Sequence, residues 1–256
     1  MSRLEEALQG GNRLIAFIVA GDPDPVRSYE LACDVIESGA DVLELGLPFS
    51  DPLADGPTIQ EAGQRALKAG MNTDRYFEFA AKIRGRYGTP LVCLTYYNIV
   101  LQYGLPKFAK SCAQTGIDGL IIPDLPIEEA GPLHKELRMV GVDLVFLVAE
   151  TTTDGRLRRI CDAASGFIYV VALLGTTGAR DELSPKLKGL IARITRKTKL
   201  PLAVGFGISR PEHVRQVIEF GADAAIVGSG IVKLGGDRQK VREYVRALVS
   251  AARSQA

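Results

Sequence analysis

Short apolar runs recur along the chain, and each is followed by a segment in which charged residues return at the helical period of about 3.6. The runs are continuous rather than alternating, which indicates strands buried on both faces, as in a parallel sheet covered by helices. This alternation of strand and helix predicts an α/β fold. Eight strands are expected, at residues 14–20, 41–47, 89–97, 119–124, 143–149, 167–173, 200–207 and 224–230.

The junctions between helical segments and strands carry a weak internal repeat. Four of them read Gly-x-Asp, at 39–41, 116–118, 141–143 and 221–223. Glycine readily takes the left-handed conformation that ends a helix, and Asp suits the tight turn that follows. Because no linker or change of composition interrupts the pattern, we expect residues 1–256 to form a single (β/α)8 TIM barrel. A short helix at 2–9 should precede the first strand, with extra helical turns in the βα loops near 74–86 and 97–103.

The alternative α/β architecture is an open, doubly wound sheet. That fold usually carries a G-x-G-x-x-G turn directly after its first strand. The first predicted strand is followed instead by Gly21-Asp22-Pro23, and the glycine pairs come late in the chain. The pattern therefore favours the barrel over the open sheet.

Charge and composition argue against several classes of partner and binding site. Lys and Arg total 31 against 30 Asp and Glu, a net charge of +1, so no basic surplus is available for a nucleic acid or an anionic membrane. No apolar run approaches the ~20 residues that span a bilayer, and the charged start lacks the apolar core of a signal peptide, so we expect a cytoplasmic protein. The four cysteines are widely separated and lack metal-binding spacing, so neither a disulfide nor a metal site is expected.

Carboxylates are the side chains best placed for proton transfer. Both histidines, His134 and His213, fall in predicted outer helices, and no lysine lies inside a predicted strand, where Schiff-base chemistry would need one. Glu44 is surrounded by apolar residues in the second strand, where burial would raise its pKa toward neutrality and suit it to donate and accept a proton. The proline-rich loop that follows holds Asp55 over the same end of the barrel. Each also has a structural interpretation. Glu44 would then face a polar residue of a covering helix or form a buried ion pair, and Asp55 would be a turn residue.

Glycine-rich turns follow the last three predicted strands. Gly205-Phe206-Gly207 ends the seventh strand and Gly228-Ser229-Gly230 the eighth, so these turns should lie side by side in a barrel. Bare backbone N–H groups and a hydroxyl at this place form the usual phosphate site of the architecture. A third turn, Gly175-Thr176-Thr177-Gly178, would close over the same anion. The residues alone predict an enzyme that needs no cofactor and acts on a small phosphorylated compound by carboxylate acid/base chemistry.

One long motif gives the chain a family resemblance. The segment LELGLPFSDPLADGPTIQ at 43–60 is similar to the α subunit of tryptophan synthase, and the resemblance runs nearly end to end. It implies the retro-aldol cleavage of indole-3-glycerol phosphate to indole and glyceraldehyde 3-phosphate. The other matching segments are FIVAGDP at 17–23, TYYN at 95–98, PDLPIEE at 123–129, GTTGAR at 175–180, VGFGI at 204–208 and VGS at 227–229.

The resemblance also assigns roles. Glu44 matches the family's catalytic glutamate, which protonates indole C3 and then takes the hydroxyl proton as the bond breaks. Asp55 matches the catalytic aspartate, which accepts the indole N–H and stabilises the charge on that nitrogen. Tyr169 is implied to position the glutamate and the substrate. The residues implied to line the indole pocket are Phe17, Ile59, Leu94, Tyr96, Ile121 and Phe206, and those implied to hold the phosphate are Gly178, Gly207, Gly228 and Ser229.

The chain departs from the family pattern after the sixth strand. Many bacterial members read Ser-Arg-x-Gly-Val-Thr-Gly where this chain has ALLGTTG at 172–178. Thr177, which matches the threonine that locks the aspartate loop shut over the substrate, is retained. The Ser and Arg are absent, a departure that concerns the energetics of loop closure and not the chemistry. Pro123 also stands where many members have a small residue, near the expected partner surface.

The resemblance implies a partner as well. The α chain binds a β subunit that carries pyridoxal phosphate and receives indole through a tunnel, usually as an α2β2 assembly, so no cofactor is expected on this chain. Segments 51–57, 95–101 and 124–129 should form or adjoin that contact, with low activity alone and activation on docking. Two alternatives are a free-standing lyase that releases indole without a partner and a non-catalytic chain that only activates β. Retention of Glu44 and Asp55 counts against the second.

Overall fold

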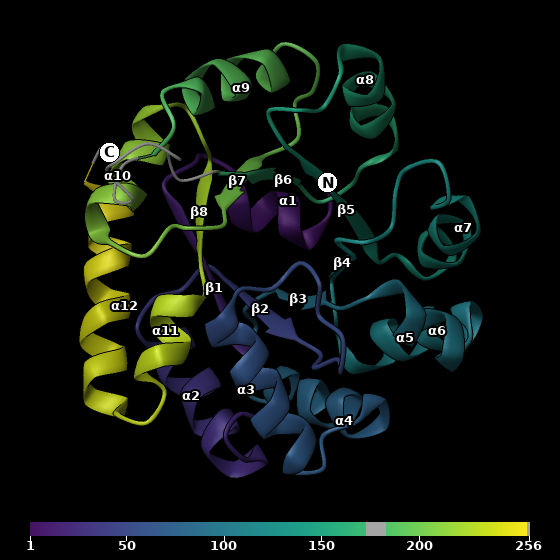
Figure 1. Cartoon of the computed structure of the whole chain (residues 1–256), viewed down its shortest axis with the longest axis vertical. Helices are drawn as coiled ribbons and strands as arrows, with labels where there is room; N and C mark the ends of the chain where they lie inside the picture. The colour runs from purple at the N-terminus through teal and green to yellow at the C-terminus, as the bar shows by residue number, and fades with distance from the viewer. Residues whose placement is uncertain (173–182, 255–256) are drawn as a thin grey trace.

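Eight parallel strands close into a barrel in chain order, with β1 hydrogen-bonded to both β2 and β8. The structure is a computed structural model that describes residues 1–172 and 183–254. Figure 1 shows the strands at the centre and helices around them. The predicted (β/α)8 barrel is confirmed, and the open sheet is wrong. The strands are β1 (Arg13–Val19), β2 (Val42–Gly46), β3 (Leu91–Leu94), β4 (Gly119–Ile121), β5 (Asp143–Val148), β6 (Ile168–Val171), β7 (Leu202–Gly205) and β8 (Ala224–Val227).

Helices alternate with these strands and cover the outside of the barrel (Figure 1). The predicted extra helices of the βα loops are present as α4 and α5. None of the helices in the described ranges is both long enough and apolar enough to cross a membrane. The helices that follow β1 are α2 (Pro25–Glu37), α3 (Pro57–Lys68), α4 (Thr73–Arg84), α5 (Tyr97–Tyr103), α6 (Leu105–Thr115), α7 (Gly131–Val140), α8 (Asp154–Ala163), α9 (Lys186–Thr195), α10 (Pro211–Glu219), α11 (Ser229–Leu234) and α12 (Arg238–Arg253).

The N-terminal helix and a set of aspartate hydrogen bonds close the end of the barrel at which the strands begin. The predicted N-terminal helix is α1 (Arg3–Leu8), whose Leu4 and Leu8 are fully buried. The Gly-x-Asp repeat also belongs to this end, because three of its aspartates accept an N–H at the start of the preceding strand, at 2.8 to 2.9 Å. The pairs are Asp41 with Leu14, Asp118 with Leu91, and Asp223 with Leu202. Because these contacts occupy the amino ends of the strands, we expect the active site at the opposite end, where the strands finish.

Candidate active site

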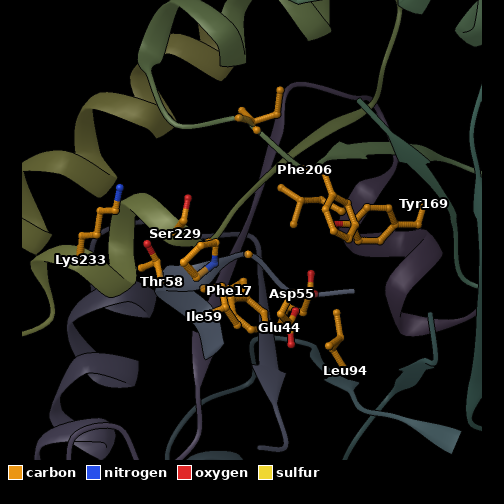
Figure 2. A pocket seen from close by; sticks show the side chains of 16 residues that line it. Phe17, Glu44, Asp55, Thr58, Ile59, Leu94, Tyr169, Phe206, Ser229 and Lys233 are labelled. Carbon is orange, nitrogen blue, oxygen red and sulfur yellow. The ribbon is translucent and has the colours of Figure 1, made fainter. Parts of the chain in front are cut away.

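A cavity of about 290 Å³ lies at the carboxyl ends of the strands. Its size is near the lower end of the roughly 300 to 1,000 Å³ typical of small-molecule sites. Figure 2 shows its side chains converging from opposite sides of the barrel. The predicted site residues that line it are Phe17, Glu44, Asp55, Ile59, Leu94, Tyr169, Phe206, Gly207, Gly228 and Ser229.

Two predicted site residues within the described ranges, Tyr96 and Ile121, do not line this cavity. Tyr96 borders a small adjoining space together with Asp55, and contacts the site through that carboxylate. Ile121 is fully buried and pairs with Leu94 in the barrel, but it does not border the cavity, so its contact with an indole ring stays a prediction. Thr177 and Gly178 lie outside the described residues.

Glu44 occupies the middle of β2 and turns its carboxyl into the barrel. The register pairs it with Phe17 of β1, which lines the same cavity. Its side chain is almost fully buried, and Oε2 has no hydrogen-bond partner among the residues that the structure describes. Burial, and after it the negative charge of Asp55, raise the pKa of Glu44 from 4.5 to about 8. Glu44 forms no ion pair with any described residue, so the ion-pair interpretation lacks support. It is a neutral acid at pH 7.

Asp55 lies in the loop between β2 and α3, beside Glu44 (Figure 2). The Tyr96 hydroxyl donates a hydrogen bond to Asp55 Oδ2 at 3.1 Å and accepts one from the Ala54 N–H at 3.1 Å. Burial raises the pKa of Asp55, and the Tyr96 hydrogen bond works against that rise. Gln60 also donates to the Asp55 carbonyl oxygen at 2.8 Å, which fixes the start of α3 against the loop. Asp55 is thus more than a turn residue, because its carboxylate points into the cavity.

Aromatic rings form one wall of the cavity. Tyr169 of β6 and Phe206 after β7 meet edge to face, with ring centroids 5.6 Å apart. A Cβ at Gly205 would overlap the Tyr169 hydroxyl, so glycine is required there for the ring to lie across β7. Phe206 itself has φ of +66°, a conformation that costs a non-glycine residue energy and is found mostly at functional sites. The backbone strain places the Phe206 ring on the cavity wall.

Phe17 forms the apolar floor between two glycines. A Cβ at Gly46 would come within 2.8 Å of the ring, and one at Gly228 within 2.9 Å. Both distances are too short for a real side chain, so these glycines make room for the ring. The floor, with Ile59 and Leu94 on either side, forms a slot that suits a flat apolar group.

The turns after β7 and β8 are held together by a residue that sequence analysis missed. The Tyr244 hydroxyl of α12 donates a hydrogen bond to the Ser209 carbonyl oxygen, and it packs against Gly230, where it leaves no room for a Cβ. Tyr244 thus ties the two glycine turns at the predicted phosphate site to each other. It lies in an ordinary amphipathic helix, so nothing in the local sequence distinguishes it.

Other unpredicted residues line the cavity itself, among them Thr58, Ile208, Ile226 and Lys233. Thr58 and Ile208 are adjacent in the sequence to the predicted site residues Ile59 and Gly207. Lys233 follows Ser229 by one helical turn on α11, a spacing that would have placed it on the same face. His134 and His213 lie on α7 and α10 and do not line the cavity, as predicted.

Comparison with known proteins gives consistent matches over most of the chain. A model of the tryptophan synthase alpha chain family matches residues 4–255. A tryptophan synthase alpha chain from Methanosarcina barkeri is 48% identical over 253 residues, covering 99% of this chain and 94% of the relative. One from Methanocaldococcus jannaschii is 49% identical over 227 residues, covering 88% and 80%. A structure described as the tryptophan synthase a2b2 complex from Pyrococcus furiosus superposes with a TM-score of 0.88 at 38% identity, covering 94% of this chain and 98% of that chain.

Proposed function

This chain belongs to the tryptophan synthase alpha chain family, whose reaction is the cleavage of indole-3-glycerol phosphate to indole and glyceraldehyde 3-phosphate, and we propose that Glu44 and Asp55 carry it out. The chain is therefore a carbon–carbon lyase of tryptophan biosynthesis. The observation that carries the assignment is the buried, neutral carboxyl of Glu44, which forms no ion pair with any described residue and faces the same apolar slot as the Asp55 carboxylate.

Glu44 acts first as an acid and then as a base. The protonated carboxyl gives its proton to indole C3, which leaves a positive charge on the ring. The resulting carboxylate then takes the proton of the hydroxyl adjacent to C3 while the carbon–carbon bond breaks. The bond electrons return to the ring to give indole, and the carbon that held the hydroxyl becomes the aldehyde of glyceraldehyde 3-phosphate. Glu44 ends the cycle protonated, as it began.

Asp55 and the slot hold the ring in the geometry that this transfer needs. The Asp55 carboxylate accepts the indole N–H and stabilises the positive charge that spreads to that nitrogen after C3 is protonated. Phe17, Ile59 and Leu94 contact the faces and edge of the ring, and Tyr169 with Phe206 limits its movement. Gly207, Gly228 and Ser229 bind the phosphate at the other end of the cavity, while the roles of Thr177 and Gly178 stay predictions.

The pH dependence of cleavage should follow the two carboxyl groups. We expect kcat/KM to fall above about pH 8, because Glu44 in the free protein loses the proton that it must donate. The acid limb should lie above pH 3.8, the usual pKa of Asp, because burial raises the pKa of Asp55, which must be ionised. Initial rates of indole release across the pH range test this. No decline above pH 8 would contradict the assignment of Glu44 as the acid.

A tryptophan synthase β subunit is the partner of this chain, as in the a2b2 complex from Pyrococcus furiosus. We infer that the contact uses the segments expected from the sequence, since two of them carry exposed large apolar side chains. Leu53, in the loop with Asp55, is 94% exposed, and Leu101 of α5 is 49% exposed. Burial of these two side chains against a partner would remove apolar surface from water and so favour docking. A cytoplasmic location, expected from the lack of long apolar runs in the sequence, stays a prediction.

Docking of β should activate the chain, because the loop that would touch the partner also carries Asp55. We expect indole release from indole-3-glycerol phosphate to be slow with the purified chain and to rise at least about tenfold when a β subunit is added, a coupling of ordinary size for two linked sites. The same assay tests the reaction itself. Full turnover without β, unchanged by its addition, would favour a free-standing lyase. Activation of β without any indole release by this chain would favour a non-catalytic subunit.

A further inference from the structure

The phosphate of the proposed substrate brings a large charge into a cavity that already contains acids. A phosphate monoester carries about −1.5 to −2 at pH 7. Glu44 and Asp55 line the same space, and Asp55 must be ionised during the reaction. A positive charge near the phosphate would offset this accumulation of negative charge. Among the described residues that line the cavity, Lys233 alone carries a positive charge.

Lys233 and Ser229 lie one helical turn apart on α11 and therefore share a face. Both side chains line the cavity, while Ile231 and Val232 of the same helix are buried against the protein. Figure 2 shows Lys233, Ser229 and Thr58 grouped on one side of the cavity, with Glu44, Asp55 and Leu94 on the other. The cavity thus has a cationic, hydroxyl-bearing end and an acidic end.

The Lys233 ammonium is available to bind a ligand. It forms no ion pair with any residue in the described ranges, unlike Lys240 of the next helix, which pairs with Asp237 at 3.0 Å. Lys233 is exposed at the cavity mouth, so it reaches an anion from the solvent side. The turn that precedes it is fixed, because Tyr244 packs against Gly230 and binds Ser209.

We propose that Lys233 binds the phosphate of the substrate and makes the site selective for the phosphorylated compound over the same compound without phosphate. The backbone N–H groups of the glycine turns orient the anion, and the lysine supplies the point charge that a phosphate needs. This inference rests on the proposed function, since it names a further binding residue for the same substrate. Lys233 takes no part in proton transfer, so it should affect affinity rather than the chemical step.

Lys233→Met should raise KM for indole-3-glycerol phosphate about tenfold, roughly the effect of one charge-assisted hydrogen bond in a partly solvated site, with kcat little changed. Binding of indole-3-glycerol, which lacks the phosphate, should be unchanged. Lys233→Arg keeps the positive charge and should recover most of the affinity. The matched control is Lys135→Met on α7, an exposed lysine that does not line the cavity, and it should keep the wild-type KM.

Calorimetric binding of glycerol 3-phosphate separates this inference from the proposed reaction, because it does not depend on cleavage. The wild-type chain should bind this probe about tenfold more tightly than Lys233→Met, and added NaCl should shrink the difference. Equal affinities would overturn the role of Lys233, whatever the rate of indole release. If Lys233 contributes to this binding but the wild-type chain cleaves no indole-3-glycerol phosphate, the proposed reaction fails and the role of Lys233 stands.

Discussion

Glu44→Gln should reduce cleavage of indole-3-glycerol phosphate by about a thousandfold or more, because the amide can neither donate the proton to C3 nor take the hydroxyl proton afterwards. Both proton transfers depend on the Glu44 side chain, so this one substitution removes both. Single-turnover indole release with excess enzyme measures the chemical step directly. Turnover near the wild-type rate would show that another group carries the proton.

The same variant should fold normally, and its stability provides a control. Glu44 is neutral in the folded protein up to about pH 8 but ionises above 4.5 when the chain unfolds. The unfolded state therefore gains stability from ionisation between these pH values, and wild-type stability should fall as the pH rises through this window. Glutamine cannot ionise, so the variant should be at least as stable as the wild type at pH 8 in thermal unfolding. A strongly destabilised variant would instead indicate a structural role for the carboxyl.

Asp55→Asn should lower kcat by about a hundredfold, an effect typical of removing one preorganised electrostatic group from a transition state. Asparagine keeps an oxygen that can accept the Tyr96 hydrogen bond, so the loop should hold its place while the negative charge is lost. Steady-state indole release measures the effect. The matched control is Asp154→Asn at the start of α8, an exposed position away from the cavity, which should leave kcat unchanged. Equal rates for wild type and Asp55→Asn would remove the carboxylate from the mechanism.

The barrel fold and the acid Glu44 can be predicted because each produces a strong sequence signal. Strands covered on both faces are apolar throughout, so their number and order are visible. A single charge in the interior of such a run, Glu44, conflicts with its apolar surroundings, which is why it can be identified from the sequence alone. The sequence signal for Asp55 is weaker, because Asp-Gly pairs also form ordinary turns. Only its position after Glu44 and the family motif identify it.

The carboxyl ends of the strands are harder to predict, because side chains that form the site extend the buried pattern beyond the strand. Residues 89–97 were predicted as one strand, whereas β3 ends at Leu94. Of the three residues that follow in this range, Tyr96 and Tyr97 are aromatic, and Tyr96 packs against Phe49 and holds Asp55 beside the cavity. At the carboxyl ends of the strands, aromatic side chains form cavity walls, so burial continues after pairing stops.

The sequence also does not tell which interior residues border the cavity. Ile121 and Leu94 are neighbours in the sheet, yet Leu94 lines the cavity and Ile121 does not. Apolar pattern identifies which residues face the interior, but the interior is filled in layers, and only the uppermost layer meets a ligand. Tyr244 was missed for a related reason, because a helix far along the chain supplies it to the turns after β7 and β8.

Deuterium exchange at indole C3 tests the central role of Glu44 most directly, because it isolates proton transfer from bond cleavage. Wild-type chain incubated in D2O with indole, and with glycerol 3-phosphate to fill the phosphate end, should place deuterium at C3 faster than buffer alone, since Glu44 delivers it there. The Glu44→Gln variant should exchange only at the buffer rate. If that variant exchanges C3 as fast as the wild type, Glu44 is not the acid, and the account of this site is wrong.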